Sequence, residues 1–154
     1  MKLAEGLVLR ADIKKRIEQL RERLKLSVLV QEGESPPEDP QKLFAELRRL
    51  LAQMTDLIQR INRTNLQAAL PDGRTLTSAL AERDTMTLYH HVLHATVEAA
   101  TAKVDRLGRA EIKKIPTVNI AELRELMDDV ARQRRELDTL IQSVNWTTEL
   151  LEEP

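Results

Sequence analysis

The feature that most constrains the fold is an apolar spacing of three and four positions, which recurs in four long stretches of the chain. The spacing is strict in the second stretch, at Leu43, Leu47, Leu50, Met54, Leu57 and Ile61. Residues at such intervals form one stripe on an α-helix, because a helix has about 3.6 residues per turn. The pattern predicts helices over residues 3–29, 40–63, 78–107 and 120–145.

Residues with known preferences at helix ends support these limits. Asp39 precedes Pro40, so it can cap the second helix while proline occupies its first position. Asn119 and Glu122 have the spacing of a capping box at the start of the fourth helix. Thr77 is predicted to cap the third helix and Gly108 to end it.

Asp72 and Gly73 favour a tight turn, which predicts a short hairpin or ordered loop over residues 65–76. The composition is 32% charged and only 2% aromatic, which is typical of long helices rather than of β-sandwiches. We therefore expect an all-α fold, an antiparallel bundle of four long helices in a single domain, 1–154.

The third predicted helix has two apolar faces. One comprises Ala79, Met86, Leu93, Val97, Ala100 and Val104, and the other, about half a turn away, comprises Leu80, Leu88, Val92, Ala95, Ala99 and Ala102. A peripheral helix of a simple bundle needs only one such face. The second face predicts either a central position within its own bundle or a coiled-coil contact with a second copy.

His90, His94 and Glu98 form the one cluster that resembles a metal site. They are four residues apart in succession, so they share a helical strip, and imidazole and carboxylate suit Zn²⁺ or a similar divalent ion. A complete site would need ligands from another helix or subunit. The same seam also contains Arg83, Thr87, Thr101 and Asp105, which is typical of a solvated face.

Motifs for other chemistry are absent. The chain has no cysteine and only four glycines, with no phosphate-binding loop or nucleophile elbow. Thr87 and Leu88 stand where a diiron site of the Glu-x-x-His type needs glutamate. We expect no enzymatic activity and no established cofactor.

Charge and hydropathy indicate the partners. With 24 basic and 25 acidic residues, the net charge of -1 does not favour nucleic acid. The first predicted helix is basic at Lys14, Lys15, Arg16, Arg21, Arg23 and Lys25, but Glu18 and Glu22 offset that charge. We expect ion pairs between helices from Arg83-Asp84 and Arg134-Arg135-Glu136. No membrane span and no export signal are visible, which predicts a cytoplasmic protein.

Several segments resemble the septicolysin-like bacterial proteins, in the same order along the chain: 10–24, 31–34, 37–40, 60–65, 72–77, 81–84, 115–118 and 145–150. The resemblance implies a helical homo-oligomer, up to a hexamer, with no established activity, and it transfers no metal site. From all these features we predict a non-enzymatic, self-assembling protein. The alternatives are a metal-binding protein that uses His90, His94 and Glu98, and the cytolysin or haemolysin that the family name suggests.

Overall fold

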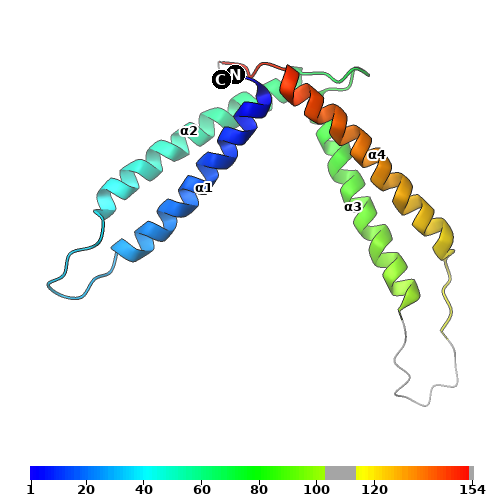
Figure 1. Ribbon diagram of the computed structural model, residues 1–154, viewed down its shortest axis with the longest axis horizontal. Coiled ribbons are helices and arrows are strands. Elements are labelled where there is room, and N and C mark those ends of the chain that lie inside the picture. The colour runs from blue at the N-terminus through cyan, green and yellow to red at the C-terminus, as the bar shows by residue number, and fades with distance from the viewer. Residues whose placement is uncertain (103–113, 153–154) are drawn as a thin grey trace, which may run out of the picture. The chain divides into compact units, whose positions relative to one another are not determined.

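The computed structural model describes residues 1–102 and 114–152, which form four long helices (Figure 1). These are α1 (Leu3–Ser27), α2 (Pro40–Gln67), α3 (Leu76–Thr101) and α4 (Ile120–Thr147). The described residues contain no β-strand. The predicted all-α class, with four long antiparallel helices, is confirmed.

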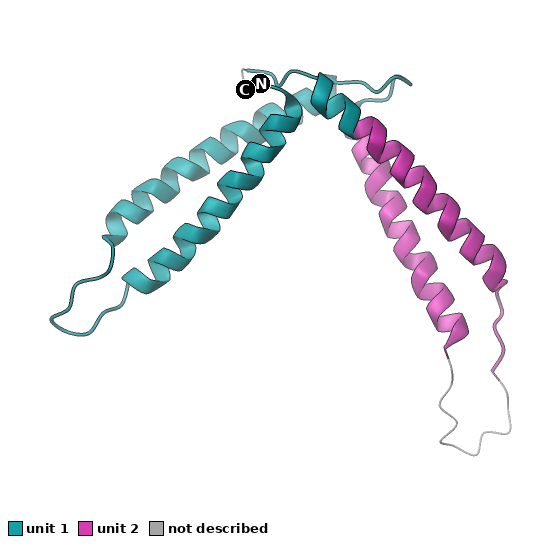
Figure 2. Ribbon diagram, in the orientation of Figure 1, with its two compact units in different colours: residues 1–76, 142–154 teal, residues 77–141 magenta. Residues whose placement is uncertain are grey.

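The chain divides into two compact units (Figure 2). Unit 1 contains residues 1–76 and 142–154, and unit 2 contains residues 77–141. Within unit 1, α1 and α2 run antiparallel. Within unit 2, α3 runs antiparallel to the larger part of α4, so each unit is built around a helical hairpin.

The apolar stripes predicted from the sequence form the interior of each hairpin. In unit 1 the buried residues include Ile13, Leu20, Leu43, Leu50, Leu57 and Ile61. In the described part of unit 2 they include Ala79, Leu93, Val97, Val130, Leu137 and Ile141. Each fully buried leucine or isoleucine stabilises the fold by about 1.5–3 kcal/mol. One face of each helix thus accounts for the cohesion of its hairpin.

Within unit 1, backbone hydrogen bonds connect the first residues of the chain with the segment that follows α4. The backbone N–H of Leu3 donates to the carbonyl of Thr148 at 2.9 Å, and that of Leu150 donates to the carbonyl of Met1 at 2.8 Å. The side chain of Leu150 is buried beside Gly6, where a Cβ atom would lie 2.9 Å from Leu150 Cδ2. Glycine at position 6 therefore permits this close approach of the C-terminal segment to α1.

The predicted hairpin between the second and third helices is confirmed. Ala69 and Thr75 form an isolated antiparallel bridge, and the Leu70 N–H donates to the Arg74 carbonyl at 2.8 Å. Gly73 has a φ of 89°, in the left-handed region that favours glycine. The turn thus has the conformation that Asp72-Gly73 predicted.

The first two helices differ from their predicted ends for reasons of packing. Helix α1 stops at Ser27 rather than 29, since the exposed Val28 and Val30 gain no burial that would offset the low helix propensity of β-branched residues. Helix α2 continues to Gln67 rather than 63, because Thr64 is buried and extends the packed stripe by one turn.

The later helices also differ at their ends. Helix α3 begins at Leu76, which is fully buried, so the predicted cap at Thr77 is wrong and Thr77 lies in the first turn. Helix α4 continues to Thr147 rather than 145, since Val144 and Asn145 are both buried. The predicted end of the third helix at 107, with Val104, Asp105 and Gly108, lies outside the described residues.

Two of the three predicted helix caps, at Asp39 and Asn119, are confirmed. The Gln41 N–H donates to Asp39 Oδ1 at 2.9 Å, and Pro40 occupies the first position of α2. The Glu122 N–H donates to Asn119 Oδ1 at 3.2 Å at the start of α4. Local sequence signals therefore determine these two helix starts.

Candidate functional site

The predicted metal-ligating residues lie on α3 in unit 2. His94 and Glu98 are in contact, with 3.5 Å between His94 Nδ1 and Glu98 Oε2, and both side chains are largely exposed. His90 is half-buried one turn earlier. Across residues 1–102 and 114–152, no three His, Asp or Glu side chains are grouped so that they could hold a metal ion. The metal site, with ligands from elsewhere, stays a prediction.

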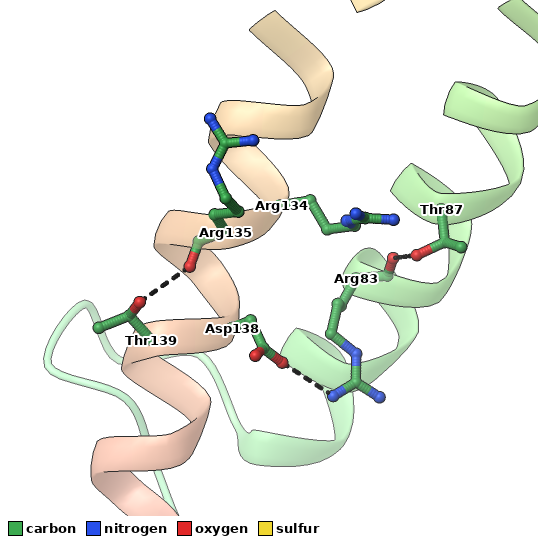
Figure 3. A pocket seen from close by; sticks show the side chains of 6 residues that line it. All are labelled: Arg83, Thr87, Arg134, Arg135, Asp138 and Thr139. Carbon is green, nitrogen blue, oxygen red and sulfur yellow. Dashed lines mark hydrogen bonds and ion pairs between the residues drawn. The ribbon is translucent and has the colours of Figure 1, made fainter. Parts of the chain in front are cut away.

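A cleft of about 490 Å³ lies between α3 and α4 within unit 2 (Figure 3). Its lining residues are Arg83, Thr87, Arg134, Arg135, Asp138 and Thr139. Two turns of α3 supply the first two of these residues, and consecutive turns of α4 supply the other four. Three arginines against one aspartate make this cleft a local concentration of positive charge.

The arginines of the cleft differ in their partners. Arg83 Nη1 donates to Asp138 Oδ1 at 3.2 Å, and Arg83 Nη2 donates to Asp84 Oδ1 at 3.3 Å. Arg134 is half-buried, extends toward α3 in Figure 3, and has no ion pair with any residue that the structure describes. Arg135 lies at the rim of the cleft. A guanidinium without an ion pair has five N–H donors that are available to a ligand.

The remaining polar groups of the cleft are already engaged within their own helices. Thr87 Oγ1 donates to the Arg83 carbonyl at 3.0 Å, and Thr139 Oγ1 donates to the Arg135 carbonyl at 3.0 Å. Asp138 is held by Arg83, so the lining has no free general base. This arrangement suits the binding of an anion better than proton transfer.

The predicted ion pairs between helices are present in part. Arg83 on α3 pairs with Asp138 on α4 at 3.2 Å, and it also contacts Asp84 on its own helix at 3.3 Å. Arg134 and Arg135 have no ion pair with any residue that the structure describes, and Glu136 pairs with Arg132 at 3.8 Å. Arg132 precedes Glu136 by four residues and shares its face, so this pair forms within α4 rather than between helices.

A second feature is an exposed apolar strip on α3, which we call the outer strip of α3. It comprises Ala81, Thr85, Leu88, Val92, Ala95 and Ala99. Leu88 is 64% exposed and Val92 is 54% exposed, whereas Leu93 and Val97 on the opposite side are buried. Of the second apolar face predicted for this helix, Leu88, Val92, Ala95 and Ala99 are exposed, whereas Leu80 is half-buried and Ala102 follows the end of α3. The first predicted face is covered within the hairpin at Ala79, Leu93 and Val97.

Helix α2 has a comparable strip on its exposed side, which we call the outer strip of α2. It comprises Phe44, Arg48, Leu51, Thr55, Ile58 and Asn62. Its three large apolar residues are seven positions apart, and their exposed fractions are 39%, 46% and 37%. A seven-residue repeat of this kind is typical of helices that pack against another helix.

The basic residues of α1 are largely neutralised. Arg21 pairs with Glu18 at 3.1 Å and Lys25 pairs with Glu22 at 2.7 Å, as predicted. The hydrogen bond from Lys25 lowers the pKa of the Glu22 carboxyl below its ordinary value. A hydrogen bond from Arg23 likewise lowers the pKa of Glu38 in the following loop. These contacts support a solvated ionic face on α1.

The fold and these surfaces define an all-α protein of antiparallel helical hairpins with exposed apolar strips and an arginine-lined cleft. Residues 10–150 match the Family of unknown function (DUF6847), and the chain belongs to this family. A comparison with curated proteins gives no match.

A solved structure supports the fold. It is titled "Crystal structure of a functionally unknown conserved protein from Corynebacterium diphtheriae", and it is 37% identical to this chain with a TM-score of 0.91. The match covers 98% of this chain and 99% of that one. The description of that protein assigns it no function.

The resemblance to the septicolysin-like proteins is wrong, because the match over residues 10–150 is to a different family. The expectations that rested on the resemblance, a hexamer and a haemolysin, lose their basis with it. Short charged segments such as 10–24 follow common helical patterns and so carry little information about family. Among the described residues, no helix has the length and apolar character needed to cross a membrane.

The arginine cleft was not predicted from the sequence. The sequence predicts a polar seam that contains Arg83 and Thr87, and ion pairs between helices from Arg134-Arg135-Glu136, but it does not place these two groups together. One sequence signal for the cleft is the pair Arg134-Arg135. No acidic residue stands three or four positions before Arg134, so no ion pair within the helix is expected from that side. Only the pairing of α3 with α4 shows that the two groups face the same space.

Proposed function

We propose that this protein is a non-enzymatic, self-associating helical protein, in which the outer strip of α3 in one copy packs against the outer strip of α2 in a second copy. The observation that carries the proposal is the exposure of large apolar residues at helical spacing on both strips. Exposed apolar surface that is contiguous commonly marks an interaction site, since removing it from water is favourable.

The sizes of the side chains on the two strips are complementary. The outer strip of α2 presents bulky residues at positions 44, 51 and 58, whereas the outer strip of α3 presents alanine at 81, 95 and 99. Both strips repeat every seven residues, which is a rise of about 10.5 Å along a helix. Large side chains of one helix can therefore insert between small ones of the other, as in coiled coils.

The charges on the two strips are also complementary. Arg48 lies within the outer strip of α2 and has no ion pair with any described residue. Asp84 and Glu98 flank the outer strip of α3 and are exposed. Two α3 strips placed together would bring acidic residues close to one another, whereas an α2 strip supplies the opposite charge, which favours the mixed pairing.

The test is the mass of the native protein and of two variants by size-exclusion chromatography with light scattering at micromolar concentration. We expect the wild type to be heavier than the 17.6 kDa of one chain. Leu88→Glu and Leu51→Glu should each lower that mass. The control is Leu29→Glu, which places the same charge on a residue that is 85% exposed and lies outside both strips.

Mixing the two variants distinguishes the possible pairings. Each variant retains one intact strip, so an equimolar mixture should form a complex that neither variant forms alone. A wild type of 17.6 kDa would contradict the proposal. Failure of the mixture to associate would contradict the α2-to-α3 pairing and would favour contacts between like strips.

A further inference from the structure

We propose that the arginine cleft of unit 2 is a binding site for a phosphate group, held between Arg134 on α4 and Arg83 on α3. No comparison assigns a ligand to this cleft. The proposal does not depend on self-association. With a rotation of about 100° per residue, Arg83 lies about 160° around the axis of α3 from the centre of the outer strip of α3, on the opposite side of the helix.

The first argument is the state of Arg134. Arg134 is half-buried, its side chain extends across the cleft toward α3, and it has no carboxylate partner among the residues that the structure describes (Figure 3). A cation withdrawn from water is stabilised when an anion accepts its hydrogen bonds. Arg135 also has no ion pair among the described residues, but it is exposed and its guanidinium extends away from α3 in Figure 3. Arg134 is therefore the unpaired arginine that extends into the cleft.

The second argument is the orientation of Arg83. Asp138 and Asp84 each accept one hydrogen bond from it, at 3.2 Å and 3.3 Å. Arginine has five N–H donors, so three remain for a ligand. Asp138 holds the guanidinium in place between the two helices. The cleft thus has donors on both sides whose positions are set by the pairing of α3 and α4.

The third argument is the charge and size of the cleft. Three arginines line the cleft, and Asp138 and Asp84, both partners of Arg83, offset two of their charges, so the excess is positive. A phosphate group has three strong acceptor oxygens, so it can accept from Arg134 and Arg83 together, whereas a carboxylate has two. The volume of about 490 Å³ is within the usual range of small-ligand sites, so a phosphate monoester as well as free phosphate has room.

Isothermal titration calorimetry of the full chain in an oxyanion-free chloride buffer at constant ionic strength tests the site. The probes are inorganic phosphate, phenyl phosphate and acetate. We expect both phosphates to bind more tightly than acetate, and the tighter of the two shows whether the ligand is free or esterified. No phosphate binding, or a preference for acetate, would overturn the proposal.

Substitutions at two positions of α4 locate the binding. Arg134→Gln should weaken phosphate binding by about tenfold or more, since hydrogen bonds between charged groups are strong. Arg124→Gln removes the same charge from an exposed position of α4 outside the cleft and should bind as the wild type does. Equal weakening in both variants would show nonspecific attraction and would refute the site. Circular dichroism without phosphate checks that both variants are folded. Arg134→Lys keeps the positive charge but has fewer N–H donors, so its affinity for phosphate should lie between those of the wild type and Arg134→Gln.

Discussion

Replacing Thr64 with valine tests how firmly the C-terminal segment is attached to α2. Thr64 is 2% exposed, and its hydroxyl donates to the Arg60 carbonyl at 2.8 Å and accepts from the Leu151 N–H at 3.1 Å. Valine has nearly the same shape but no hydroxyl, so the N–H of Leu151 loses its acceptor. The side chain of Arg60 still donates to the Leu151 carbonyl at 2.7 Å and keeps the segment nearby.

The expected cost follows from two opposing effects. A partly buried N–H that loses its acceptor costs about 1–3 kcal/mol. The additional apolar group of valine recovers about 0.8 kcal/mol on burial. Helix propensities of threonine and valine are similar and contribute little. We therefore expect Thr64→Val to lower the free energy of unfolding by about 1 kcal/mol.

Urea denaturation at one fixed protein concentration measures this change, and amide hydrogen exchange locates it. The control is Thr147→Val, because Thr147 is exposed and its hydroxyl donates only to carbonyls of its own helix. The control should change stability by less than about 0.5 kcal/mol. The Leu151 amide should lose protection only in the Thr64 variant. Equal destabilisation in the two variants, or unchanged protection of Leu151, would refute the reasoning.

Two further variants test a helix cap and an ion pair at the joined chain ends. Asp39→Ala removes the acceptor of the Gln41 N–H and should cost about 1 kcal/mol in thermal unfolding; a loss no greater than that of Ser35→Ala in the preceding loop would contradict it. Hydrogen bonds from Lys2 and from the N-terminal amine lower the pKa of Glu149 below its ordinary value of 4.5. Because the folded-state pKa is the lower one, this stabilisation is present above pH 4.5 and is lost as the pH falls through the folded-state value. Glu149→Gln should therefore flatten the acid limb of the stability profile, and the same flattening in Glu152→Gln would count against the pairing.

The sequence predicted the helices most reliably where local and tertiary preferences agree. Asp39 and Asn119 begin α2 and α4 as expected, because a side-chain cap needs only residues within one turn. The hairpin at Gly73 was predictable for the same reason. The end of α2 was not, since the additional turn at Thr64 depends on a contact with Leu151, which is 87 residues away.

The candidate sites divide in the same way. The two apolar faces of α3 were visible in the sequence, because the helical period alone assigns residues to faces. Which face is covered could not be read from the period, and the structure shows that Leu93 is buried while Leu88 is exposed. His94 and Glu98 are in contact, and no group of three His, Asp or Glu side chains among the described residues could hold a metal ion, so the site of His90, His94 and Glu98 stays a prediction.

The class of fold, the four helices and most of their starts follow from the amino-acid sequence, since these depend on spacing and caps within a few residues. The folded chain shows which stripes are buried in each hairpin, how the segments near the chain ends are connected, and that Arg83 and Arg134 line one cleft. These features depend on distances between side chains that lie far apart in the sequence. The spacing along one helix limits which residues can share a face. The neighbouring helix that packs against it determines which side chains that face contacts.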